Sequence, residues 1–149
     1  IYGSLTLSTG ITLAASTSAW IFAATSGTKT ITTNGKTLDF PLTFNGVGGT
    51  WQLQDALTMG STRTLTHTNG TVDLNGKTLT VGTTYATAAG TKNLTFNSGT
   101  LACPTASTTV TSPTWRVVNF TLTVRLLHSA LALYFTILTS VPDGSRRPT

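Results

Sequence analysis

Hydrophobic and polar residues alternate in short segments that return at a nearly constant spacing along the first two thirds of the chain. The clearest series begins with Gly-Thr and ends with an aliphatic residue. Its members lie at steps of 22, 21 and 20 residues, at positions 27–31, 49–53, 70–74 and 90–94. A steady repeat near 21 residues, made of short alternating segments, is typical of a solenoid in which each repeat forms one coil.

A second series follows the first at 37–40, 56–59, 78–81 and 100–103, and its alternation is strict. Successive side chains of a strand point to opposite faces, so each segment should bury two residues. The expected inward pairs are Leu38/Phe40, Leu57/Met59, Leu79/Val81 and Leu101/Cys103. In the first series we expect an aliphatic ladder of Ile31, Leu53, Leu74 and Leu94, with polar rows about 4.8 Å apart facing water.

A third, less regular series is visible at 42–44 and 64–66, with a counterpart near Tyr85. Asn-Gly pairs at 34–35, 45–46, 69–70 and 75–76 separate the apolar segments and supply positive φ at low cost. We therefore predict an all-β fold, a parallel β-helix (β-solenoid) with coils of about 21 residues. A β-hairpin meander or sandwich is the alternative, because Asn-Gly between alternating strands is also a hairpin signal.

The repeat divides the chain into a solenoid region at 1–112, clearest at 27–103, and a hydrophobic and basic tail at 113–149. The first 26 residues read as weaker coils. Three interpretations of the tail stay open: a cap, a membrane or interfacial segment at 126–141, or a sequence not native to the repeat protein. The apolar run at 126–141 is short for a membrane helix, which needs about 20 residues. The chain starts without Met and shows no signal peptide, so we expect a fragment of a longer protein that continues in further coils.

Charge is scarce: 9% of the residues are charged, Glu is absent, and Thr is the most frequent residue. The net charge of +5 comes largely from arginines in the tail, so residues 1–112 are nearly neutral. Without a run of Lys and Arg, we expect no nucleic-acid partner. The single cysteine, Cys103, excludes a disulfide framework and shares the phase of buried apolar residues.

Polysaccharide lyases and hydrolases built on solenoids cluster carboxylates, and this chain offers little of that kind. Asp39 and Asp73 lie in different series and have no Glu as a partner, so the pair of carboxylates that glycosidic chemistry needs is not apparent. His67 and His128 lie far apart, and we expect His67 at the surface or rim. We predict no enzyme, no metal site and no cofactor.

Trp51 and its neighbours Gln52 and Gln54 form the one candidate ligand site, a contact for a cell-surface glycan. An aromatic ring can stack on a sugar, and amide side chains can bond to its hydroxyl groups. The alternative is that Trp51 packs in the core or covers an edge.

The sequence from residue 49 to residue 82, GTWQLQDALTMGSTRTLTHTNGTVDLNGKTLTVG, resembles the Thr/Gly/Asn-rich repeats of uncharacterised phage virion proteins, tail-fibre-like proteins and bacterial surface adhesins. This resemblance covers residues 27–103 and implies a structural repeat segment of an elongated virion or cell-surface fibre, with trimers as a common assembly. The alternatives are a glycan-binding adhesin module and a polysaccharide lyase or hydrolase fragment.

Overall fold

A computed structural model describes residues 1–103 and the backbone of residues 115–118. These residues form twelve strands and no helix. The first six strands are β1 (Leu5–Thr6), β2 (Trp20–Phe22), β3 (Thr28–Thr32), β4 (Thr37–Leu38), β5 (Leu42–Leu53) and β6 (Leu57–Met59). The other six are β7 (Thr64–Asp73), β8 (Thr78–Thr80), β9 (Thr84–Thr87), β10 (Lys92–Thr95), β11 (Thr100–Ala102) and β12 (Trp115–Val118).

All pairings between these strands are parallel, and each joins one coil to the next. The larger sheet has the order β1-β3-β5-β7-β10-β12, with β2 beside β5 and β9 beside β7; the smaller has the order β11-β8-β6-β4. The coils are about 22 residues long and make about four turns, so the predicted β-solenoid is confirmed. Hairpins would require antiparallel neighbours.

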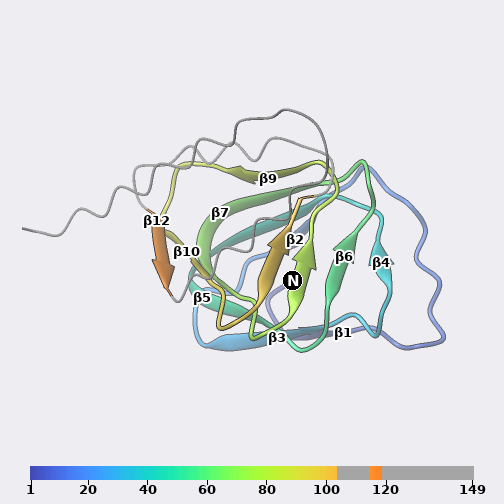
Figure 1. Cartoon of the computed structure of the whole chain (residues 1–149), viewed down its shortest axis with the longest axis horizontal. Helices are drawn as coiled ribbons and strands as arrows, with labels where there is room; N and C mark the ends of the chain where they lie inside the picture. Colours follow the sequence, from blue (N-terminus) through green and yellow to red (C-terminus); the bar gives the residue numbers. More distant parts are fainter. Residues whose placement is uncertain (104–114, 119–149) are drawn as a thin grey trace, which may run out of the picture.

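The larger sheet forms two faces of the solenoid because β5 and β7 each run through both (Figure 1). The first face consists of β2, β9 and the opening halves of β5 and β7. The second face holds β1, β3, β10, β12 and the closing halves of β5 and β7. The third face is the smaller sheet.

The interior is mainly apolar, as the alternation predicts. Every member of the expected first ladder is buried, and so are the inward pairs of the second series in its first three segments. Leu101 and Cys103 are half-buried and pack against this core. The third series is also confirmed, because Leu42, Leu65 and Tyr85 are partners on neighbouring strands.

The register differs from the sequence alignment at two places, each time by two residues. Leu94 lies opposite Val72, not Leu74, because the corner of the fourth coil (88–91) has two residues more than the corner of the third coil (68–69). Leu38 lies opposite Met59, not Leu57. A shift of two residues preserves the inward phase, so burial was predicted correctly although the partners were not.

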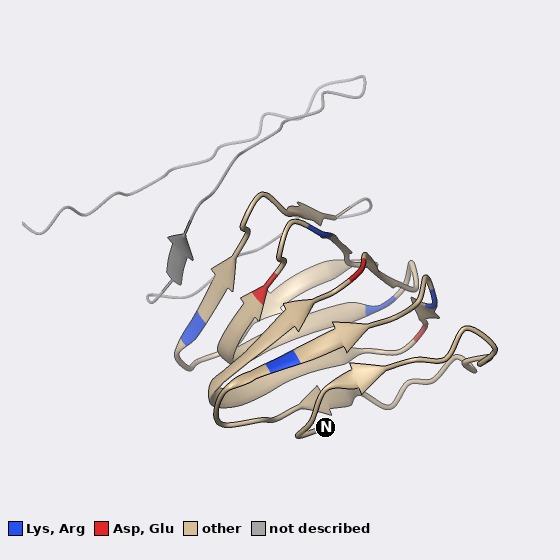
Figure 2. Ribbon diagram, turned by 90° about the horizontal axis from the view of Figure 1, so that it is seen from below, with Lys and Arg blue, Asp and Glu red and all other residues tan. Residues whose placement is uncertain are grey.

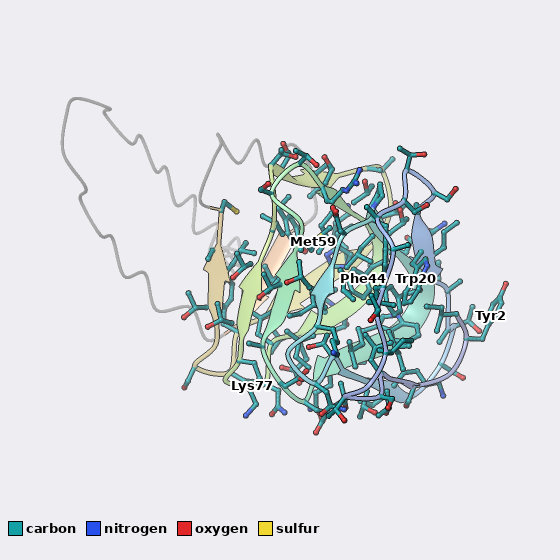
Figure 3. All side chains as sticks on the ribbon, turned by 90° about the vertical axis from the view of Figure 1, so that its right-hand side faces the viewer. Tyr2, Trp20, Phe44, Met59 and Lys77 are labelled. Atoms are coloured by element: carbon teal, nitrogen blue, oxygen red, sulfur yellow. The ribbon has the colours of Figure 1, made fainter. Side chains whose placement is uncertain are left out.

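The N-terminal residues stack on the first complete coil, at the end of the solenoid, with little regular structure. The amide N of Leu7 donates to the carbonyl of Thr32 (2.9 Å), and that of Ser16 donates to the carbonyl of Asp39 (2.9 Å). Tyr2 projects away from the body and is 75% exposed (Figure 3). Beyond the fourth coil, β12 pairs in parallel with β10, past residue 112. The segment 126–141 lies outside the described residues.

Candidate functional site

The outer surface of the second face carries a chain of amide side chains that ends on a carboxylate. Gln54 donates through Nε2 to Oε1 of Gln52 (3.0 Å), and Gln52 donates to Oδ2 of Asp73 (3.0 Å). Oδ1 of Asp73 accepts from the backbone N of Asn75 and from Nδ2 of Asn97, both at 2.9 Å. The bonds of Asp73 to Gln52 and Asn97 join neighbouring coils, and together with the bond from Asn75 they engage both carboxylate oxygens.

Trp51 does not join that surface. Its side chain is 0% exposed and packs edge-on against Phe22, with ring centroids 4.8 Å apart, and near Phe44 at 6.3 Å. Gln52 and Gln54 face outward on the same strand, so alternation separates them from the ring of Trp51. In this arrangement the ring of Trp51 offers no face on which a sugar could stack. Its position is the one expected for a side chain that packs in the core.

The other aspartates of residues 1–103 also hold corners of the coils together. Asp39 accepts from Nε of Arg63 at 2.7 Å, with the Arg63 side chain 18% exposed. Asp55 accepts from both the backbone N (2.8 Å) and the hydroxyl (3.1 Å) of Thr33. These contacts link residues of successive coils, which is a structural role for each carboxylate.

A polar cluster lies inside the solenoid, between the third and fourth coils. Nδ1 of His67 is 2.6 Å from the hydroxyl of Tyr85, and Nε2 is 3.1 Å from the carbonyl of Gly70. Lys92 enters the same region from β10 and donates through Nζ to the carbonyl of Gly90 (2.8 Å). His67, Tyr85 and Lys92 are all at most 1% exposed.

The charges of this cluster follow from its burial. Burial lowers the pKa of His67 from 6.5 to about 4, the hydrogen bond to Gly70 opposes this shift, and the Lys92 charge adds to it. Burial also raises the pKa of Tyr85, with a smaller contribution from Cys103. At neutral pH the imidazole and the phenol are therefore uncharged, and Lys92 supplies the nearby cation.

The expectation that His67 lies at the surface is wrong. His67 is the first-face partner of Phe44 and shares the inward phase of Leu65, two residues before it. That phase was readable in the sequence, but the polarity of histidine favoured an outward position. Lys92 likewise shares the inward phase of Leu94, two residues after it, but the charge of lysine favoured an outward position; in the structure it lies opposite Gly70.

Charged residues are few on the ribbon and are spread over several strands and corners instead of gathering in one patch (Figure 2). Within the described residues, no group of three or more His, Cys, Asp or Glu side chains is placed to hold a metal ion. The same part of the chain has no helix that is long and apolar enough to span a membrane.

Comparisons with protein families, curated proteins and solved structures find no match to this chain. The β-solenoid architecture rests on the parallel pairing of successive coils.

Proposed function

We propose that this chain is a structural repeat segment of an elongated fibre of a virion or a cell surface, with no catalysis. The observation that carries the proposal is the parallel pairing of each coil with the next on all three faces. In such a stack each coil is held only by its neighbours, so the architecture can be lengthened without a new fold. Further coils of a longer chain, and other copies in a homotrimer, are the proposed partners.

The outer surface supports the same proposal. Its polar rows consist mainly of hydroxyl and amide groups. One row on the second face reads Thr30, Gln52, Asp73 and Thr95, in which Asp73 is the one carboxylate. The aspartates of residues 1–103 are engaged in contacts between coils. The stability of a rod with this surface would depend little on ionic strength, because salt screens exposed charges and this surface has few.

The test uses an antibody raised against the chain and material from the source of the gene. We expect gold-labelled antibody to mark filaments on virus particles or on the cell surface in electron micrographs. Labelling confined to the cell interior, with no filament marked, would contradict the proposal.

A glycan array separates the rod from the adhesin alternative. We expect no sugar to bind. Binding that is lost in the double variant Gln52→Ala/Gln54→Ala, and kept in Trp51→Phe, would replace the proposal by an adhesin whose contact is the outer amide row.

The enzyme alternative is tested separately, with acidic polysaccharides as substrates. We expect no turnover by the full chain. Turnover that disappears in Asp39→Asn or Asp73→Asn would overturn the proposal.

A further inference from the structure

The interior of the solenoid changes from aromatic to polar along its axis. One inward column of the first face reads Phe22, Phe44, His67 and Thr87 in successive coils. The rings of Phe22 and Phe44 stack at a centroid distance of 4.8 Å, and that of His67 meets Phe44 edge-on at 6.1 Å. His67 therefore continues an aromatic column with a ring that can take a proton.

The partners of the imidazole fix where its proton lies. A carbonyl oxygen can only accept, so Nε2 of His67 carries the hydrogen and donates to Gly70. Nδ1 is then the acceptor of the neutral ring, and the hydroxyl of Tyr85 donates to it at 2.6 Å. This bond joins β7 to β9 and thus the third coil to the fourth.

Adding a proton to Nδ1 changes both the hydrogen bond and the charge. Nδ1 becomes a donor, so the hydroxyl of Tyr85 can no longer donate to it and has to reorient so that its oxygen accepts instead. The imidazolium also places a second positive charge in the buried region of Lys92. Burial and the Lys92 charge both disfavour the protonated ring.

We propose that the His67–Tyr85–Lys92 cluster is an acid-sensitive contact that holds the fourth coil on the third and releases it when His67 takes up a proton. A rod containing this contact would loosen its distal coils in an acidified compartment. The inference does not depend on the fibre proposal, since it concerns the stability of the coil stack in any setting.

The groups that face the cluster come from each neighbouring strand. β5 contributes Phe44, which does not titrate, β9 contributes Tyr85, and β10 contributes Lys92. Cys103, which follows β11, adds an electrostatic contribution that raises the pKa of Tyr85. The raised pKa of Tyr85 keeps its phenol uncharged in acid, so we assign the titration of this cluster between pH 7 and 5 to His67.

The sign of the pH effect follows from the two pKa values of His67. The unfolded chain takes up a proton near pH 6.5, whereas the folded chain does so only near pH 4. The stability that the neutral ring of His67 contributes is thus fully present above pH 6.5, and it is lost as the pH falls towards 4. Between pH 7 and 5 the unfolding equilibrium constant should rise about 20-fold.

The experiment compares two variants of the full chain, and both carry His128→Gln. The first has no other change and serves as the parent, so His67 is its only histidine. The second also carries His67→Phe, which continues the aromatic column, and Tyr85→Phe, which removes the hydroxyl partner of Nδ1. Urea unfolding at pH 7 and 5 should give the 20-fold rise for the parent and less than about a 2-fold rise for the variant. Amide exchange, corrected for intrinsic rates, should open first at 84–95 in the parent at pH 5.

Equal pH dependence in the two proteins would overturn the inference. If the variant does not fold, the ring nitrogen shifts of His67 in the parent decide the question by NMR. A neutral ring with the proton on Nε2 at pH 5 supports the acid-sensitive contact, whereas titration of the folded protein near 6.5 overturns it.

Discussion

The burial of a single side chain in this protein follows from its phase along the strand more than from its chemical type. Trp51 and His67 both have the inward phase, and both are 0% exposed. Alternation was sufficient to predict the buried leucines. The same alternation gives His67 an inward phase, but polar side chains are usually exposed, which favours the opposite prediction. The hydrogen bonds to Tyr85 and Gly70, which make this burial tolerable, depend on the three-dimensional register and could not be predicted.

A carboxylate introduced at an inward position should unfold the stack. Leu79 is 1% exposed and lies between Leu57 and Leu101 on the third face. Leu79→Asp should cost several kcal/mol, because the buried carboxylate has no partner. On the same face Thr58 points outward and is exposed, so Thr58→Val should change the free energy of unfolding by less than about 0.5 kcal/mol. Urea denaturation measures both; a midpoint for Leu79→Asp equal to that of the parent would contradict the inward assignment.

Trp51 carries a buried polar atom whose removal should offset part of the cost of a substitution. Within the described residues its Nε1 has no hydrogen-bond partner. Trp51→Ala should cost about 3–5 kcal/mol through the cavity beside Phe22 and Phe44. Trp51→Phe keeps a ring there and removes the unsatisfied N–H, so its cost should be only about 1 kcal/mol. Equal losses for the two variants in urea denaturation would mean that Nε1 does have a partner in solution.

At the scale of the element, the strands were predictable and the corners between them were not. The alternating segments located strands on all three faces, since each face has its own inward phase. The registers went wrong where successive corners differ in length, as between 68–69 and 88–91. A corner can gain two residues without changing which side chains point inward, so periodicity alone does not reveal the extra residues.

The corner between the first and second faces should tolerate no added side chain at Gly70. Its φ is +86°, and a Cβ there would lie 2.4 Å from the carbonyl oxygen of Gly46 and 2.9 Å from that of Gly49, both in the preceding coil. Gly76 provides the matched control, since it has a φ of +72° but its Cβ would meet nothing closer than the carbonyl oxygen of Asn97 at 3.6 Å.

Gly76→Ala should therefore cost only the backbone strain, about 1–2 kcal/mol. Gly70→Ala should cost about 1–3 kcal/mol beyond that, because the crowding atoms belong to the backbone and cannot turn away. Thermal and urea unfolding of the two variants measure this difference. The same loss at both positions would show that the corners are not in close contact in solution.

For the whole molecule, the decisive property is that each coil is a template for the next. The four-fold recurrence of Gly-Thr segments was enough to predict this architecture, because only a stack brings segments of one series together in sequence order. Fibre function is a step beyond architecture, since a stack of coils can also carry a binding site. What distinguishes a rod is that its length can change while its local contacts do not.

Duplicating one internal coil tests that property directly. Thr50 and Thr71 are partners on neighbouring strands, so residues 50–70 span one coil, and a second copy inserted after Gly70 keeps every face in phase. The longer chain should stay folded, gain about 4.8 Å along its axis in small-angle scattering, and unfold at an equal or higher urea concentration. An insert of the same residues in scrambled order is the control, because it adds the same composition without the inward ladder. It should be destabilising or form a loop outside the stack. If the duplicated coil behaves like the scrambled one, the coils are not independent repeats, and a structure that cannot be extended in this way would be a poor segment of a fibre.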